Sequence, residues 1–318
     1  MIFDVFNGDA DGLCALHQLR LAEPAEAALV TGVKRDIGLL KRVTAEAGDR
    51  VTVLDITVEK NLAALQSLLA KGVKVRWFDH HNPGELPVQP GFEPHIDTAA
   101  EVCTSLLVDR YLAGRYRAWA VAGAFGDNLH QAARRAAEPL QLALPQLAAL
   151  QELGECLNYN AYGDSIDDLY FSPAELYRRL HGYADPFAFI AEAPEFVRLR
   201  AGYAEDMRLA EATWPYVERS SGAVFVLPHA AWARRVSGVY ANALAQARPD
   251  RAHALLTPLA QDHYLVSVRA PVNNRVGADS LCQRFEGGGG RKAAAGINNL
   301  PEAQLDAFVQ AFYETYPG

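Results

Sequence analysis

The sequence predicts an α/β protein, with a mainly parallel N-terminal sheet flanked by helices and a smaller C-terminal α/β domain. In the first half of the chain, short apolar runs alternate with segments of helical periodicity, which is typical of βαβ units with parallel strands. After a polar helical stretch, the apolar runs return and end in a glycine-rich segment. The chain has 318 residues, half of them hydrophobic, and is therefore long enough for two cores.

The expected domain boundaries follow this change in composition. We expect a first domain over 1–185, a helical connector over 186–216 and a second domain over 217–318. Residues 216–318 hold ten Lys+Arg and eight Asp+Glu, which gives a net charge of +2. The rest of the chain holds twenty Lys+Arg and thirty Asp+Glu, which gives −10 of the total of −8. We therefore expect an anionic substrate to contact the second domain, and the acidic balance argues against binding of duplex nucleic acid.

The first strand is expected over 1–6, and it leads into a carboxylate-rich turn that ends where helical spacing begins. This turn is Asn7-Gly8-Asp9-Ala10-Asp11-Gly12. Ligands of an open parallel sheet bind beyond the carboxyl ends of its strands, and the two glycines give Asp9 and Asp11 the freedom to converge. Alternatively, Asp11 caps the helix and Asp9 is solvated.

Two later strands also end in side chains that bind metals. The expected elements are strands over 27–31, 51–55 and 73–78, with helices over 37–47 and 62–70. Asp55 ends the second of these strands, and Asp79, His80 and His81 follow the third. Parallel strands share one carboxyl edge, and imidazole with carboxylate suits Mn, Fe, Zn or Ni. Alternatively, the two histidines lie by chance in a solvated loop.

Three helices are expected next, over 99–112, 117–125 and 140–158. Asp127 lies in the short break after the second of them, Gly126-Asp127-Asn128. From there its carboxylate could reach the same edge of the sheet, or it could cap a helix.

The second domain is expected to contain strands over 223–227, 252–256 and 264–268 and a helix over 237–246. Its strongest signal is the run Gly287 to Gly290, followed by Arg291 and Lys292. Four glycines leave backbone N–H groups free to wrap an anion, and Arg269 adds charge nearby. Alternatively, the run is a flexible linker. The expected substrate contacts are Arg269, Gly288, Gly289, Gly290 and Arg291.

These motifs together resemble those of the DHH phosphoesterase superfamily. The residues that carry the resemblance are Asn7-x-Asp9-x-Asp11-Gly12, Asp55, Asp79-His80-His81, Asp127 and the glycine run with Ala294-Ala295-Gly296. The match includes the DHH-associated C-terminal domain and covers essentially the whole chain. The length is similar to that of compact members, the oligoribonuclease/phosphoadenosine-phosphate phosphatases and the cyclic-dinucleotide phosphodiesterases.

The resemblance implies an active-site cleft between the domains and two metal ions, usually Mn²⁺, with Mg²⁺ or Co²⁺ as alternatives. Two ions about 3.5–4 Å apart would clamp the phosphate and activate water. Asp55 would bridge the ions, and His81 and Asp79 would be the catalytic residues, with Asp79 orienting the histidines. The implied metal ligands are Asn7, Asp9, Asp11, Asp55, His80 and Asp127.

Two positions depart from the family pattern. Asn7 stands where the first motif normally begins with histidine, and an amide oxygen is a poorer ligand for a transition metal than imidazole. Arg291 stands where histidine usually follows the glycine run, and a guanidinium is permanently charged and binds phosphate in a fork. We therefore expect one weak metal position and a substrate with more free phosphate.

The leading functional hypothesis is a metal-dependent phosphoesterase that hydrolyses a short nucleotide or oligonucleotide. The alternatives are a pyrophosphate or polyphosphate hydrolase, and a non-catalytic nucleotide-binding protein with an incomplete metal site. The expected partner is a nucleotide or another phosphorylated small molecule, without duplex nucleic acid or membrane, and a homodimer is compatible with the sequence.

The chain start lacks a basic segment with a following apolar run, and no run of about eighteen apolar residues occurs. Four cysteines without a CxxC pair are expected to be reduced thiols. We therefore expect a cytoplasmic protein.

Overall fold

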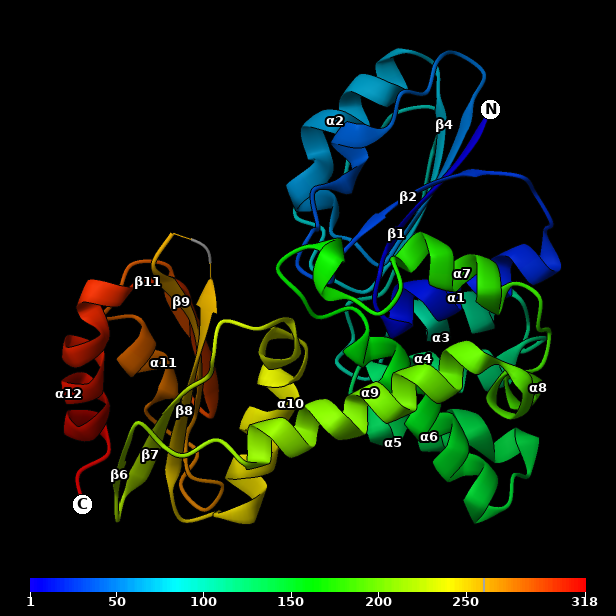
Figure 1. The fold of residues 1–318 in the computed structure, drawn as a ribbon. Helices are drawn as coiled ribbons and strands as arrows, with labels where there is room; N and C mark the ends of the chain where they lie inside the picture. Colours follow the sequence, from blue (N-terminus) through cyan, green and yellow to red (C-terminus); the bar gives the residue numbers. More distant parts are fainter. Residues whose placement is uncertain (260) are drawn as a thin grey trace. The chain divides into compact units, whose positions relative to one another are not determined.

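The structure is a computed structural model that describes residues 1–259 and 261–318. It divides into two compact units, Met1–Ala201 and Gly202–Gly318 (Figure 1). The expected connector contains helices α8 (Pro186–Glu192) and α9 (Pro194–Glu211), and the division between the units falls inside α9. Among the described residues, no helix has both the length and the apolar character that a membrane span needs.

The first unit is built on five parallel strands in the order β2-β1-β3-β4-β5. The strands are β1 (Ile2–Asn7), β2 (Ala28–Gly32), β3 (Arg50–Leu54), β4 (Lys74–Asp79) and β5 (Phe92–Ile96). The first four confirm the predicted strands and their parallel arrangement. The sequence analysis missed β5, whose Pro94 lacks an N–H group and is tolerated because the strand lies at the sheet edge.

The central strands β1 and β3 are buried on both faces, as expected for parallel strands that are covered by helices on both sides. Alternate side chains on each strand enter two different cores. Helix α2 (Val58–Ala70) packs on the face that carries Val5, Val53 and Trp77. Helix α1 (Ala10–Ala22) packs on the opposite face, which carries Phe6, Leu54 and Phe78 (Figure 1).

The helix predicted over 37–47 is wrong. Only a 3₁₀ turn forms there, η1 (Leu39–Arg42). The side chain of Asn61 on α2 accepts the N–H of Leu40 at 3.1 Å and donates to the carbonyl of Ile37 at 2.8 Å. Tertiary contacts therefore fix this segment as an irregular connection, and its leucines enter the core beside α2.

A layer of helices completes the first unit. It contains α3 (Thr104–Tyr111), α4 (Arg117–Gly126), α5 (His130–Ala137), α6 (Leu144–Tyr159) and α7 (Pro173–Leu180), with 3₁₀ turns η2 (Glu138–Leu140) and η3 (Ile166–Asp168). A Cβ atom added to Gly126 would lie 2.3 Å from Cβ of Ala10, and one added to Gly154 would lie 2.1 Å from the Ala122 carbonyl oxygen. These glycines permit the close packing that brings the end of α4 to the start of α1.

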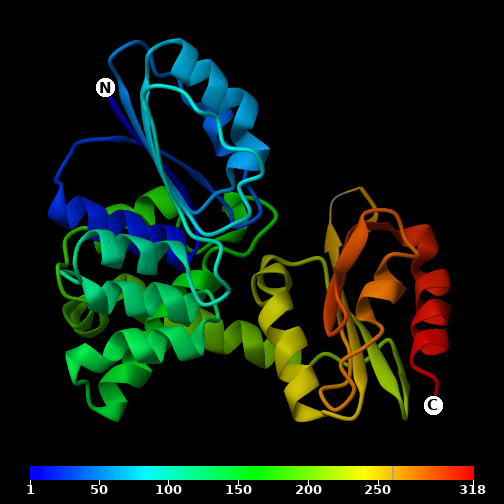
Figure 2. The ribbon, with the colours of Figure 1, turned by 180° about the vertical axis from the view of Figure 1, so that it is seen from behind.

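The second unit contains a six-stranded mixed sheet in the order β10-β11-β9-β8-β7-β6. Its strands are β6 (Val217–Arg219), β7 (Gly222–Val226), β8 (Ala252–Leu259), β9 (His263–Arg269), β10 (Gly288–Arg291) and β11 (Ala294–Pro301). Helix α10 (Ala231–Ala247) covers one face, and α11 (Ala278–Cys282) and α12 (Leu305–Thr315) cover the other (Figure 2). A 3₁₀ turn, η4 (Glu302–Gln304), precedes α12. The strands and the helix expected in this part of the chain are confirmed.

The glycine-rich segment forms an edge strand, β10, rather than a flexible linker or a loop that wraps an anion. Packing requires two of its glycines. A Cβ atom at Gly288 would lie 1.9 Å from the Cys282 carbonyl oxygen, and one at Gly290, where φ is 142°, would lie 2.5 Å from Cα of Ala295. At Gly289 a Cβ atom would meet no atom within 4 Å, so the fold itself does not demand glycine there.

Candidate metal centre

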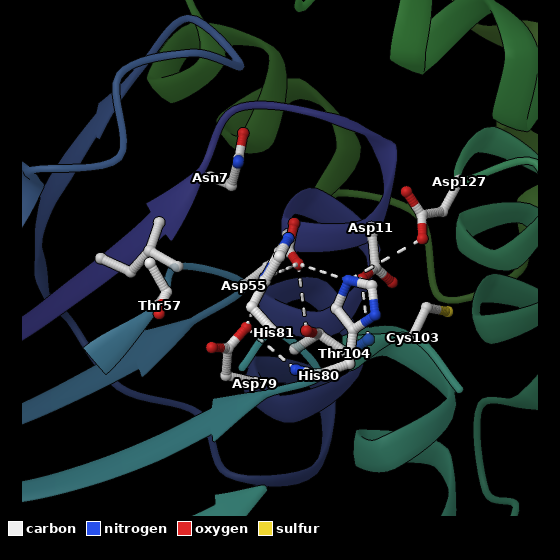
Figure 3. Close-up of polar contacts among 12 residues, drawn as sticks. Asn7, Asp11, Asp55, Thr57, Asp79, His80, His81, Cys103, Thr104 and Asp127 are labelled. Carbon is white, nitrogen blue, oxygen red and sulfur yellow. Dashed lines mark hydrogen bonds and ion pairs between the residues drawn. The ribbon is translucent and has the colours of Figure 1, made fainter. Parts of the chain in front are cut away.

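Carboxylates and imidazoles converge at the carboxyl edge of the parallel sheet, as the strand ends predict. Two groups of side chains have ligand atoms that all lie within 4.8 Å of one another: Asp55 with His80 and His81, and Asp11 with His80 and Asp127. His80 belongs to both groups. Figure 3 shows its imidazole among these carboxylates, which come from the ends of β3, α1 and α4. A donor set of carboxylate oxygens and imidazole nitrogens fits a divalent transition metal.

The distances around His80 show how closely these residues approach. Its Nε2 lies 3.4 Å from Oδ1 of Asp55, 3.9 Å from Oδ2 of Asp11 and 3.8 Å from Oδ2 of Asp127. One imidazole nitrogen therefore faces three carboxylates, an arrangement that leaves a concentration of negative charge at the sheet edge.

Asp11 is held in position by the first turn of α3. Its Oδ2 accepts the N–H of Thr104 and its Oδ1 the N–H of Ser105, both at 2.7 Å. The N-terminal N–H groups of a helix have no partner within the helix, and they stabilise a carboxylate placed against them. Asp11 thus joins α1, on which it lies, to α3.

Asp55 is buried and its backbone is strained. Its φ is 60°, which is uncommon for a residue other than glycine, and such conformations cluster at functional sites. The hydroxyl of Thr104 donates to its Oδ1 at 3.1 Å. Burial, followed by the charges of Asp9, Asp11 and Asp127, raises the pKa of Asp55 well above its usual value. A bound cation would relieve this repulsion.

Asp127 follows α4 and occupies the helix C-cap position, so it is not an N-cap. Asn128, the next residue, has a φ of 61°, and this turn directs the chain away after the carboxylate. Burial, and then the charge of Asp11, raises the pKa of Asp127 to about 7, although Lys34 acts in the opposite direction. This group, too, is an acid crowded by other acids.

Asp79 contacts both histidines, His80 through its backbone and His81 through its ring. Its Oδ1 accepts the backbone N–H of His80 at 2.9 Å and lies 2.8 Å from Nδ1 of His81. This bond to Asp79 raises the pKa of His81 against the opposing effect of burial. Oδ2 of Asp79 is buried without a hydrogen-bond partner in the part of the chain that the structure describes. The side chain of His81 is 47% exposed, so it remains open to a ligand.

Asp9 does not join either group of three. It is the N-cap of α1, whereas the alternative considered from the sequence placed Asp11 in that role. Its Oδ1 accepts the N–H groups of Asp11 and Gly12 at 3.1 Å each. Its Oδ2 forms an ion pair with Nζ of Lys34. Burial raises the pKa of Asp9, but the charge and hydrogen bond of Lys34, together with the hydrogen bonds from Gly12 and Asp55, lower it below its usual value.

Asn7 is engaged by the backbone. Its Oδ1 accepts the N–H of Asp9 at 3.3 Å, and its Nδ2 donates to the carbonyl of Lys34 at 3.2 Å. In Figure 3 it stands to one side of the residues around His80. Of the six expected metal ligands, Asp11, Asp55, His80 and Asp127 lie in the two groups of three, whereas Asn7 and Asp9 bind backbone N–H groups beside them.

The expected substrate contacts lie in the second unit. Arg291 on β10 is paired in register with Ala294, which is paired with Arg269 on β9, so the two arginines share one face of the sheet. Nε of Arg269 donates to Oδ1 of Asn242 on α10 at 2.7 Å. Arg291 is exposed. The unit thus presents a row with two arginines beside a glycine strand.

Sequence reasoning missed two residues of this site. Thr104 binds both Asp11 and Asp55, and no local pattern identifies it, because its partners are 93 and 49 residues away. Lys34 follows β2 by two residues. Lys34, like Asp55, lies near the carboxyl end of a parallel strand. That position is the sequence signal that identifies it.

The comparisons with known proteins bear on the fold. No family model and no curated protein matches the sequence. Among solved structures, exonuclease RecJ bound to manganese is 20% identical with a TM-score of 0.63, over 99% of this chain and 89% of that one. RecJ from Thermus thermophilus, in complex with Mn²⁺, is 19% identical with a TM-score of 0.57, over 98% of this chain and 51% of that one.

Two further structures match over nearly the full length of both chains. The pGpG-specific phosphodiesterase PggH from Vibrio cholerae is 13% identical with a TM-score of 0.55, over 98% of each chain. CDC45 from Entamoeba histolytica is 9% identical with a TM-score of 0.53, over 100% of this chain and 95% of that one. All of these proteins belong to the DHH superfamily, which confirms the predicted fold class and the resemblance. The chain has the DHH-superfamily fold over nearly its whole length.

Proposed function

We propose that the protein is a metal-dependent phosphoesterase that hydrolyses the phosphoester bond of a short nucleotide or oligonucleotide. The observation that carries this proposal is the position of His80, whose Nε2 lies within 3.9 Å of the carboxylates of Asp11, Asp55 and Asp127. The fold supports it, because two solved proteins with this fold are manganese complexes and another is a phosphodiesterase for pGpG.

Asp11, Asp55, His80 and Asp127 are the residues that would hold the cation, with Mn²⁺ as the first expectation. A divalent cation at such a site polarises a phosphoryl oxygen and lowers the pKa of water. The chain preorganises the ligands, because the start of α3 binds Asp11 through two N–H groups and Asp55 through the Thr104 hydroxyl. Ligands held in this way need little reorganisation when the cation binds.

His81 would contact the scissile phosphate beside the cation. Asp79 engages Nδ1 of His81 at 2.8 Å and so fixes the orientation of the ring. Nε2 is then the atom that faces a substrate oxygen, and the half-exposed side chain is accessible to it. Asp79 acts as a positioning residue in this assignment.

Arg269, Arg291 and the backbone at Gly288, Gly289 and Gly290 would bind the rest of the substrate. The two arginines lie on the same face of the sheet, and residues 216–318 carry a net charge of +2. A guanidinium forms paired hydrogen bonds with phosphate oxygens. Exposed Arg291 also favours a second candidate substrate, pyrophosphate or polyphosphate, in which every unit offers such oxygens.

A substrate panel with Mn²⁺ tests the proposal. It contains short RNAs, adenosine bisphosphate, cyclic dinucleotides and polyphosphate. We expect cleavage of a short nucleotide, loss of that cleavage in His80→Asn, and no change in His229→Asn, which alters an exposed histidine of the second unit. Cleavage of polyphosphate alone would favour the second candidate. Nucleotide binding without any cleavage would favour a non-catalytic role, and full activity in His80→Asn would contradict the proposed site.

A further inference from the structure

Lys34 directs a positive charge into the acidic site. Its Nζ pairs with Oδ2 of Asp9, lies 3.3 Å from Oδ1 of Asn158 and lies 3.9 Å from Oδ1 of Asp127. Two of the three N–H donors of the ammonium meet the oxygens of Asp9 and Asn158, and Asp127 lies at ion-pair distance. The side chain is only 28% exposed, and its Nζ lies 5.7 Å from the centre of the Tyr162 ring.

The backbone fixes the segment that carries this lysine. The N–H of Lys34 donates to the carbonyl of Ala161 at 2.9 Å, and its carbonyl accepts from Nδ2 of Asn7 at 3.2 Å. Asn7, the residue that departs from the family pattern, thus makes a contact that holds Lys34 in place.

Two of the expected metal ligands, Asp9 and Asn7, are already satisfied by the chain. Asp9 uses Oδ1 for two backbone N–H groups and Oδ2 for the ammonium. Both ends of the Asn7 amide are hydrogen bonded. Because Asp9 carries one negative charge and Asn7 carries none, a single ammonium neutralises this part of the site.

Asp127 lies between this part and the rest of the metal centre. Its Oδ1 faces Nζ of Lys34, and its Oδ2 faces Nε2 of His80 at 3.8 Å. The carboxylate of Asp127 thus lies between the ammonium and the other residues that would hold a divalent cation. Like charges this close repel strongly, so a second divalent cation beside Asp9 would have to displace Lys34.

We propose that the ammonium of Lys34 takes the place of one of the two divalent cations, so that the protein holds a single divalent ion at Asp11, Asp55, His80 and Asp127. This inference rests on the proposed metal-dependent function and deepens it. An ammonium supplies fixed positive charge for an anionic substrate but no open coordination position. Activation by Mn²⁺ should therefore follow a single-site curve.

The number of bound ions tests this inference without reference to activity. Calorimetry gives the stoichiometry of Mn²⁺, and electron paramagnetic resonance distinguishes an isolated ion from a pair coupled through a bridging carboxylate. We expect one isolated ion in the wild-type protein and in Asn7→His, where the ammonium remains. We expect two coupled ions in the double variant Asn7→His/Lys34→Ala. Lys41→Ala, which removes an exposed lysine of the same unit, should bind one ion.

Each outcome bears on one of the two proposals. Two ions in the wild type would overturn the inference and leave the proposed function intact. Two ions in Asn7→His alone, or one ion in the double variant, would show that Lys34 does not exclude the second cation. No bound ion in the wild type would overturn the metal centre itself. If the double variant does not fold, the wild-type stoichiometry still decides the question.

Discussion

The hydroxyl of Thr104 donates a hydrogen bond of 3.1 Å to Oδ1 of Asp55. The N–H of the same residue donates to Asp11 at 2.7 Å. The first residue of α3 therefore holds two carboxylates that reach the site from the first turn of α1 and from the end of β3. Metal affinity should depend on this residue, although it lacks a carboxylate or an imidazole.

Thr104→Val tests that dependence, because valine keeps the shape and the N–H group but removes the hydroxyl. Loss of an outer hydrogen bond to a ligand weakens metal binding by roughly 10–100-fold. We expect a weakening in this range by Mn²⁺ calorimetry. The control is Thr315→Val, which removes a hydroxyl that donates to the Ala311 carbonyl in the second unit. Equal affinity in Thr104→Val and the wild type would show that the bond does not position Asp55.

Substitutions of Gly288 and Gly289 in β10 distinguish a role in packing from a role in substrate binding. Gly288→Ala places a Cβ atom 1.9 Å from a backbone oxygen, and we expect it to lower the free energy of unfolding by about 1–3 kcal/mol or more. Gly289→Ala meets open space and should change stability by no more than about 0.5 kcal/mol. If the backbone at Gly289 approaches substrate, KM should nevertheless rise. Thermal melts and KM measured together decide this, and an unchanged KM in Gly289→Ala would remove that glycine from the binding site.

Arg291→Ala should raise KM without changing manganese content, because the residue is exposed on a different unit from the ligands. A charge-assisted contact contributes about 1.5–3 kcal/mol, so we expect a rise of roughly 10–100-fold. Arg291→Lys should restore only part of the substrate affinity, since lysine keeps the positive charge but not the paired N–H donors of the guanidinium. Arg275→Ala, at another exposed arginine, is the control. A lower melting temperature with unaltered KM would mean that Arg291 braces the strand instead.

The strand ends were predictable because their position follows from topology. Alternating strands and helices require parallel strands, and parallel strands place Asp55 and Asp79 at one edge whatever the details of packing. The contacts of Thr104 with Asp11 and of Lys34 with Asp9 were not predictable in this way. They join residues 93 and 25 positions apart through helix packing and loop geometry, which no short sequence pattern encodes.

For the glycine run, local composition was misleading. Four glycines favour a loop when only local composition is considered, yet pairing with β11 makes the segment a strand. The reason lies outside the run, because the Cys282 carbonyl and Ala295 leave no space for side chains at Gly288 and Gly290. Gly288 and Gly290 are therefore needed for close packing. Gly289 is not, so a substitution at Gly289 can test substrate binding without disturbing the packing.

Stability should fall in mild acid because of His17. Burial lowers the pKa of this histidine to about 3, against the opposing effect of its hydrogen bond to the Tyr183 carbonyl. In the unfolded chain the pKa is about 6.5. The unfolded state therefore binds a proton at a pH where the folded state does not, so this contribution is complete above pH 6.5 and declines as the pH falls toward 3.

The expected loss of unfolding free energy from this residue is about 1.6 kcal/mol between pH 6.5 and 5, because the unfolded histidine is already half protonated at pH 6.5. Urea unfolding at the two pH values, followed by tryptophan fluorescence, measures it. His17→Gln keeps a side-chain N–H for the Tyr183 carbonyl and does not titrate, so its stability should change less over this range. An identical pH dependence in the two proteins would contradict the assignment.

The metal centre itself is tested most directly by Mn²⁺ calorimetry on the wild type and Asp55→Asn. Asparagine tolerates a φ of 60°, so the substitution removes the charge with little disturbance of the backbone. Removal of a carboxylate crowded by other acids should also leave the melting temperature of the metal-free protein unchanged or raised. We predict saturable Mn²⁺ binding in the wild type, and loss of both binding and hydrolysis in Asp55→Asn. Wild-type affinity for Mn²⁺ in a folded Asp55→Asn protein would contradict the account.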